Sequence, residues 1–265
     1  MTRNKYLLSL LTAILLIHGC ELDNSMEAGL PEGDPFPIVE AYLEEGEPFQ
    51  ILVSASNTLQ EPVRINMVWN ASVHIICEND SVKLKNLIRV DRDRNYLYNY
   101  LSDSLVSARE SGFELLIESE EYPTIRASCH SVGKVEIEDI ILDETMILEV
   151  LSRNLEDPSG NYYQLRCMEY SGGEIADIHQ IEFDKHEESE GSIKLIYPLP
   201  ANTFDSLRID LYRIDSAAYE YHRSLSNALK ANRDPFTPPT PFQGNLTNAW
   251  GLFTFVTRDS RTVLF

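Results

Sequence analysis

The sequence predicts a mostly β fold of two β-sandwich-like domains, of immunoglobulin-like or transthyretin-like kind, with one helix near the C-terminus. Short runs in which apolar and polar residues alternate recur along most of the chain, and Gly, Pro, Asn or Asp residues separate them. In the first half, the number and spacing of these runs are typical of a β-sandwich. One later segment has the period of an amphipathic helix instead.

The first predicted domain covers residues 38–133. Its opening runs, 38–43 and 49–54, flank a turn that contains Gly and Pro, which is the pattern of a β-hairpin. The segment 91–111 is charged and rich in tyrosine, and it is either a long connection or an irregular strand pair. Further strands of this domain are expected at residues 72–77, 82–85, 113–117 and 124–129.

The second predicted domain covers residues 134–265 and contains a helix at 216–231. Asp215 or Ser216 can cap this helix, because both side chains can accept a hydrogen bond from a free backbone N–H of the first turn. Its apolar face follows from the helical spacing of Ala218, Tyr221, Leu225 and Ala228. Strands are expected at residues 135–141, 146–150, 162–170, 193–197 and 207–211, with a closing strand at 253–256.

Residues 1–19 have the pattern of a signal peptide. Arg3 and Lys5 precede an apolar run, 6–17, which is shorter than the roughly 20 residues that a membrane-spanning helix needs. Cys20 directly after Gly19 resembles a bacterial lipoprotein box, so we expect cleavage before Cys20 and attachment of lipid to its thiol. The alternative is an ordinary secreted protein in which Cys20 is a spare thiol.

Residues 20–37 are acidic, contain several Pro and Gly residues and have few apolar residues, so they predict a tether between the lipidated Cys20 and the first domain. The whole chain holds 22 Lys and Arg against 42 Asp and Glu, a formal net charge of −20. This excess of acidic residues argues against a nucleic-acid partner, because such binding depends on neutralising phosphates.

Three cysteines follow Cys20, namely Cys77, Cys129 and Cys167. An exported protein can form disulfides, so Cys77 and Cys129 could pair within the first domain. Alternatively, all three are small buried apolar residues, as cysteines without a disulfide often are. The second interpretation is slightly favoured.

No motif in the sequence predicts a catalytic residue, a metal site or a cofactor. The histidines lack the H-E-x-x-H spacing, and there is neither a G-x-S-x-G elbow nor a Gly-rich phosphate loop. Asp91, Asp93 and Asn95 are spaced like the start of an EF-hand loop, but Tyr96 occupies the position that requires Gly, so we discount an EF-hand. A looser calcium site at these residues is the alternative.

Aromatic residues supply the best candidate for a binding surface. Tyr96, Tyr98 and Tyr100 alternate, so in an extended segment they share one face. With Phe236, Phe242 and Trp250 they form a candidate surface for stacking on a sugar or a partner. The alternative is ordinary packing between a sheet and a loop.

The C-terminal region resembles a known family. It contains a Tyr-x-Tyr pair in the expected helix, an Asn-x-Asp-Pro-Phe loop and a Gly-Asn-x-x-Asn-x-x-Gly-x-Phe ending; the residues are Tyr219, Tyr221, Asn232, Asp234, Pro235, Phe236, Gly244, Asn245, Asn248, Gly251 and Phe253. These motifs resemble the Bacteroidota outer-membrane lipoprotein family called domain of unknown function 4249. We expect the matched Asn and Gly residues to shape a loop rather than to contact a ligand.

The resemblance implies a protein anchored by lipid in the outer membrane, on its periplasmic or cell-surface face. Members of the family are often encoded beside TonB-dependent receptors and have no established enzymatic activity, so no catalytic residue is carried over. The expected function is therefore that of an accessory binding or scaffold partner of a TonB-dependent transporter. The alternatives are a lipid-anchored extracellular hydrolase and a purely structural envelope protein.

Overall fold

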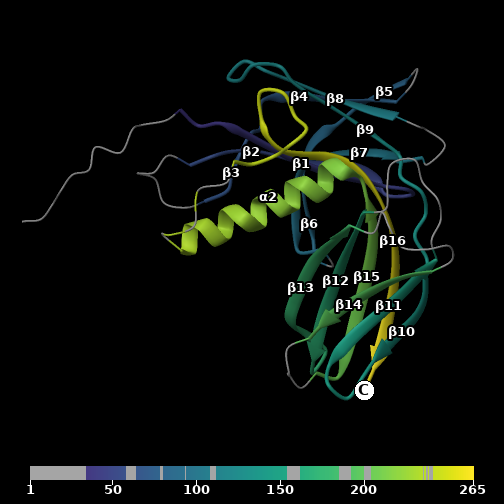
Figure 1. Cartoon of the computed structure of the whole chain (residues 1–265). Coiled ribbons are helices and arrows are strands. Elements are labelled where there is room, and N and C mark those ends of the chain that lie inside the picture. Colours follow the sequence, from purple (N-terminus) through teal and green to yellow (C-terminus); the bar gives the residue numbers. More distant parts are fainter. Residues whose placement is uncertain are drawn as a thin grey trace, which may run out of the picture. The chain divides into compact units, whose positions relative to one another are not determined.

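The computed structural model describes residues 34–57, 64–77, 80–92, 94–107, 112–153, 162–184, 192–199, 204–234, 236, 238 and 241–265. The expected signal peptide, Cys20 and most of the expected tether lie outside these residues, as does Asp93. From residue 35 to the C-terminus the chain forms one compact unit. Its strands are β1 (Pro37–Glu44), β2 (Pro48–Ala55), β3 (Asn66–Met67), β4 (Ala71–Cys77), β5 (Asp80–Lys83), β6 (Lys85–Asp91), β7 (Tyr96–Leu105), β8 (Gly112–Ser119), β9 (Ile125–His130), β10 (Ile137–Leu142), β11 (Ile147–Arg153), β12 (Tyr162–Ser171), β13 (Glu174–Asp184), β14 (Ser192–Pro198), β15 (Ser206–Ile214) and β16 (Trp250–Leu264), and its helix is α2 (Ser216–Arg233) (Figure 1).

These strands form three sheets. The largest has nine strands in the order β13-β12-β15-β16-β1-β2-β7-β6, with β3 paired to β2. Smaller sheets have the orders β5-β4-β8-β9 and β10-β11-β14. Among the described strands β1 and β16 pair in parallel, and the other pairings within these sheets are antiparallel. A mostly β fold with several antiparallel sheets and one helix near the C-terminus is therefore confirmed.

Each smaller sheet packs against one part of the nine-stranded sheet through its own hydrophobic core. The first core joins side chains of β1, β2 and β16 to those of the four-stranded sheet, with the ring of Phe113 stacked 5.6 Å from that of Phe255. The second joins side chains of β12 and β15 to those of the three-stranded sheet. The boundary between two domains at residues 133 and 134 stays a prediction. Strand β16 pairs with β1 from the first predicted domain and with β15 from the second.

Strand β16 is longer than the expected closing strand. Phe253 and Phe255 belong to the first core, whereas Leu252 and Val256, on the opposite face of the strand, pack in a third cluster with residues of α2. Alternation of side chains along one strand thus lets β16 serve both a sheet-to-sheet core and the helix.

The expected hairpin and helix are both present. Strands β1 and β2 pair in antiparallel fashion, and the turn between them contains Gly46 with a φ of +81°. Helix α2 begins after Asp215, whose Oδ1 accepts a hydrogen bond from the backbone N–H of Ala218 at 2.7 Å, so the expected cap is confirmed. No described helix is long and apolar enough to cross a bilayer.

The described part of the tyrosine-rich segment 91–111 forms one strand, β7, whose partner β6 lies almost entirely before residue 91. β6 and β7 are antiparallel, with a register shift between Asn86 and Arg89. β7 also pairs with β2 on its other side. Asn99, fully buried in β7, bonds the N–H and C=O of Val53 and the C=O of Val68 at 2.8–2.9 Å. A polar residue therefore fits in this strand because its hydrogen bonds are satisfied.

The three described cysteines are buried thiols, the interpretation that the sequence slightly favoured. Phe113 of β8 is the register partner of both Cys77 in β4 and Cys129 in β9. The two cysteines thus lie two strand spacings apart, about 9–10 Å, which exceeds the roughly 7 Å that a disulfide can span between Cα atoms. Burial raises the pKa of the Cys129 thiol well above its usual range and that of Cys167 to about 12.

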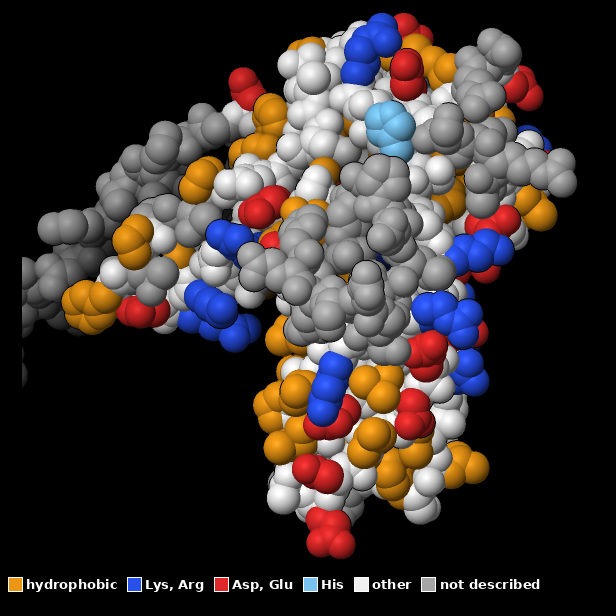
Figure 2. Space-filling view, turned by 45° about the vertical axis from the view of Figure 1, so that its right-hand side comes forward, with side chains coloured by type: hydrophobic (Ala, Val, Ile, Leu, Met, Phe, Trp, Pro, Cys, Tyr) orange, Lys and Arg blue, Asp and Glu red, His pale blue; other side chains and the backbone are white. Residues whose placement is uncertain are grey.

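The surface carries both signs of charge despite the acidic excess. Figure 2 shows Lys and Arg side chains interspersed with Asp and Glu side chains on the face in view. Among the ion pairs, Lys194 lies 2.7 Å from Glu149 and Arg153 lies 3.3 Å from Glu136, all on strands β10, β11 and β14 or just beside them. Exposed pairs of this kind contribute little to stability, about 0–1 kcal/mol each.

Candidate functional site

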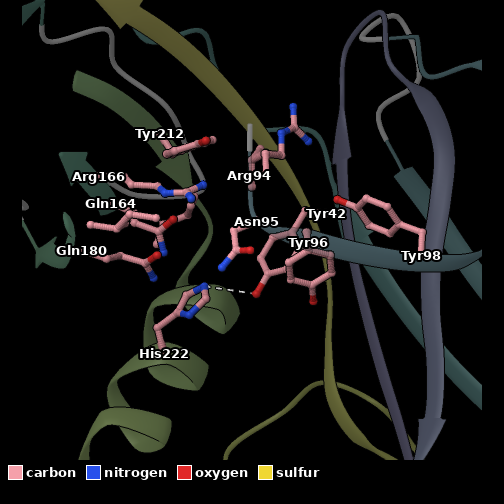
Figure 3. A pocket seen from close by; sticks show the side chains of 13 residues that line it. Tyr42, Arg94, Asn95, Tyr96, Tyr98, Gln164, Arg166, Gln180, Tyr212 and His222 are labelled. Atoms are coloured by element: carbon pink, nitrogen blue, oxygen red, sulfur yellow. Dashed lines mark hydrogen bonds between the residues drawn. The ribbon is translucent and has the colours of Figure 1, made fainter. Parts of the chain in front are cut away.

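A cavity of about 380 Å³ lies between β12, β13, β15 and β16, the turn that joins β6 to β7, β1 and helix α2 (Figure 3). This volume falls within the range of small-molecule sites in proteins. Its walls combine aromatic rings, amides, guanidinium groups and aliphatic side chains. The lining residues are Tyr42, Arg94, Asn95, Tyr96, Tyr98, Gln164, Arg166, Ile178, Gln180, Tyr212, Ile214, His222 and Val256.

Side chains of β12, β13 and β15 form one wall of the cavity, which we call the sheet wall. The alternation of side chains along β12 explains why its polar residues face the cavity. Leu165 and Cys167 point into the second core, so Gln164 and Arg166 point to the opposite face, toward the cavity. The register places Tyr212 of β15 beside Gln164 and Gln180 of β13 beside Arg166. One face of the sheet therefore builds the core, and the other presents a row of polar side chains to the cavity.

The turn between β6 and β7 forms a second wall and is fixed by ion pairs. Asn95 has a φ of +52°, a left-handed conformation that Asn tolerates better than most residues. The backbone N–H of Arg94 donates to Asp91 Oδ1 at 3.0 Å, and its guanidinium bonds the carboxylate of Glu44 on β1. Glu44 also lies 3.2 Å from Arg258 Nε on β16. This cluster ties the turn to β1 and β16.

The rings of Tyr42, Tyr96 and Tyr98 form an aromatic wall, carried by strands β1 and β7 of the same nine-stranded sheet. The Tyr42 ring packs edge-on against Tyr96 at 5.8 Å and stacks on His222 of α2 at 5.9 Å. The Tyr42 hydroxyl lies 3.5 Å from His222 Nε2, the contact dashed in Figure 3. The Tyr98 ring, two residues further along β7, lies 5.0 Å from that of Tyr96. Flat apolar faces with polar edges are thus held in fixed positions.

Glu40 of β1 supports this wall. Its carboxylate accepts hydrogen bonds from the hydroxyls of Tyr96 and, at 2.6 Å, Tyr221. Burial raises the pKa of Glu40, and the bond from Tyr221 opposes that rise. Burial, followed by the charge of Glu40, raises the pKa of Tyr42 well above its usual range, so this phenol stays neutral. Glu40 therefore orients the rings rather than facing the cavity.

His222 should make stability depend on pH. Burial lowers its pKa below the ordinary 6.5, and the charge of Glu182 opposes this. Below that value the unfolded chain binds the proton more readily than the folded chain, so the free energy of unfolding falls as the pH drops through 6.5. We expect His222→Gln to lose less stability than the wild type between about pH 8 and about pH 5.5 in urea unfolding.

His130→Gln, at an exposed histidine, is the matched control and should follow the wild type. The raised pKa of Glu40 acts in the opposite direction, because the folded chain then binds the proton more readily as the pH falls. The comparison between His222→Gln and wild type cancels that contribution. Equal pH dependence in all three proteins would contradict the prediction.

The residues expected from the sequence fall in different places. Tyr96 and Tyr98 line the cavity, and Tyr98 is almost fully buried. Tyr100 is buried in the first core, where its hydroxyl accepts from the N–H of Ala71 at 3.1 Å. The three candidates from the C-terminal region, Phe236, Phe242 and Trp250, are exposed and do not line the cavity. The Phe242 and Trp250 rings lie 6.0 Å apart, and Phe236 is 92% exposed.

Sequence reasoning missed most of the cavity, namely Tyr42, Arg94, Asn95, Gln164, Arg166, Gln180, Tyr212 and His222. One signal was available for the sheet wall. Gln164 and Arg166 alternate with Leu165 and Cys167 inside a strand pattern, which marks one polar face of that strand.

Asn245 and Asn248 of the C-terminal motif shape the loop that precedes β16. The Asn245 side chain accepts from the N–H of Phe253 at 3.0 Å and donates to its C=O at 2.7 Å. Asn248, with a φ of +59°, donates to the C=O of Thr124 at 2.9 Å. These bonds tie the segment before β16 to β16 itself and to the start of β9, as the loop interpretation expects.

Comparison with known proteins gives one finding about the family. Residues 23–262 match the family model described as "Domain of unknown function (DUF4249)". No curated protein matches the chain. The match spans most of the sequence and contains all residues of the cavity.

Proposed function

The chain belongs to the DUF4249 family, and from this premise we propose that it is a lipid-anchored outer-membrane protein that binds a small ligand for a TonB-dependent transporter. The anchor is Cys20, acylated after cleavage of residues 1–19, on the periplasmic or cell-surface face. Two acyl chains or more on this residue would hold the protein stably, whereas one chain gives marginal binding.

The observation that carries the proposal is the cavity. Its walls are fixed before any ligand arrives, by the Glu44 ion pairs, the Glu40 hydrogen bonds and the ring contacts of Tyr42. Binding sites gain affinity from such preorganisation, because less side-chain freedom is lost on binding. The concave shape and the mixture of ring faces with a few polar groups are typical of small-molecule sites.

The composition of the walls favours binding over hydrolysis. Among the described residues that line the cavity are Tyr, Arg, Asn, Gln and His side chains, but no Ser, Cys or carboxylate. A hydrolase of the triad type needs a nucleophile next to its base, and His222 instead faces the Tyr42 hydroxyl, whose pKa is raised. The cavity thus supports the accessory binding function over the hydrolase alternative.

A pull-down from native outer membrane tests the proposal. The tagged protein is recovered from detergent-solubilised membrane, and Cys20→Ala serves as the control that lacks the lipid. We expect the wild type to bring down a TonB-dependent barrel in stoichiometric amount and the control to leave the membrane fraction. High recovery of the lipoprotein alone would overturn the transporter partnership, and an unchanged membrane location of Cys20→Ala would overturn the anchor.

A further inference from the structure

We propose that the cavity binds an organic anion, a carboxylate joined to a planar apolar body, and that the guanidinium of Arg166 recognises the carboxylate. The inference rests on the proposed binding function and adds the chemical class of the ligand. It makes Arg166 the specificity-determining residue of the site.

Arg166 is the starting point because it is charged, buried and lines the cavity. It is 8% exposed, and Figure 3 shows it with Gln164 extending from the sheet wall toward Asn95 and Arg94. An arginine keeps its charge at any pH relevant to a protein. A buried charge is costly unless it is paired, and buried charges in proteins are normally paired.

The carboxylates around Arg166 already have partners. Asp210, its register neighbour on β15, accepts from Arg208 Nε at 3.0 Å and from the Ser260 hydroxyl. Glu182 lies 3.4 Å from Gln164 Nε2 and 3.3 Å from Gln180 Nε2. Within the part of the chain that the structure describes, the Arg166 side chain makes no hydrogen bond and no ion pair. Its donors therefore point to a ligand that brings the missing acceptor.

Two further guanidinium groups, those of Arg94 and Arg258, lie near the same end of the cavity as Arg166. Burial and the charge of Asp210 raise the pKa of the Tyr212 phenol, and the charges of Arg258, Arg94 and Arg166 oppose this rise. These guanidinium groups thus act on the same hydroxyl. Arg94 and Arg258 share Glu44, which leaves Arg166 to bind an incoming anion.

The rest of the cavity defines the body of the ligand. The Tyr42 and Tyr96 rings offer flat faces, and Ile178, Ile214 and Val256 add apolar contacts. A planar ring or conjugated group fits such walls by offset or edge-to-face stacking. A guanidinium matches a carboxylate through two parallel hydrogen bonds, which fixes the orientation of the plane. The combination selects a planar organic acid over a free inorganic anion.

Benzoate and benzamide are the probes that test the inference, because they have the same ring and differ in charge. Titration calorimetry at constant ionic strength compares them on the full mature protein. We expect the affinity for benzoate to exceed that for benzamide by a factor of about ten or more, because hydrogen bonds between charged groups stabilise a complex by at least that amount. Arg166→Gln should remove this difference, and Arg223→Gln, at an exposed arginine of α2, should leave it intact.

Equal affinity for the two probes, no binding of benzoate, or an unchanged preference in Arg166→Gln would each overturn the inference. Arg166→Lys keeps a point charge without the two parallel donors, so it should retain part of the preference and serves if Arg166→Gln fails to fold. The pull-down is independent of these titrations. If the protein recovers the TonB-dependent barrel but shows no preference for benzoate over benzamide, the proposed function is supported and the inference of an anionic ligand is rejected.

Discussion

Gly251→Ala is expected to lower the free energy of unfolding by about 3–5 kcal/mol, which at this chain length corresponds to a fall in Tm of roughly 10 °C or more. Gly251 has a φ of +119°, a backbone conformation that L-residues with a side chain rarely adopt. An added Cβ would also overlap the carbonyl oxygen of Val39, its register partner on β1. The change therefore strains the backbone and forces β1 and β16 apart. Thermal and urea unfolding, followed by circular dichroism, measure the loss.

Gly46→Ala separates the two causes. Gly46 also has a positive φ, +81°, but nothing lies within 4 Å of an added Cβ. Gly46→Ala should therefore lower the free energy of unfolding only by the cost of a left-handed conformation, about 1–2 kcal/mol. A loss as large as that of Gly251→Ala would show that steric contact with β1 is not the cause.

The elements that depend on short stretches of sequence could be predicted. The hairpin of β1 and β2 and the boundaries of α2 were both visible, because alternation, a turn and a cap are encoded within a few neighbouring residues. The loop role of Asn245 and Asn248 was also visible in the resemblance to the family. The same local reasoning left segment 91–111 undecided, since the polar residues of β7 satisfy contacts that lie far away in the sequence.

The cavity could not be predicted in the same way, because it depends on which strands become neighbours. Tyr42, Arg166 and His222 come from β1, β12 and α2, and no pattern within one segment links them. They meet because β16 pairs with β1 on one side and β15 on the other, and because β15 then pairs with β12. The pairing of Val39 with Gly251 joins the two ends of the described chain and is the kind of non-local contact that composition cannot reveal.

Glu44→Gln is expected to lower the free energy of unfolding by about 2–4 kcal/mol, because it removes the carboxylate shared by two mostly buried guanidinium groups. The side chains of Glu44, Arg94 and Arg258 are 12%, 11% and 20% exposed. Arg94 keeps Asp91 at 3.7 Å, so the loss should stay below that of leaving a buried charge with no partner. Release of the β6–β7 turn should also weaken benzoate binding in the same protein.

Glu45→Gln is the matched control, since the neighbouring carboxylate is 46% exposed and lies 3.9 Å from Lys134. An exposed pair of this kind contributes about 0–1 kcal/mol, so this variant should stay close to the wild type in both urea unfolding and benzoate titration. Similar small losses in the two variants would mean that the Glu44 cluster does not hold the turn. A loss of stability in Glu44→Gln without weaker binding would place the benzoate site on the sheet wall alone, with the Arg94 turn contributing no affinity.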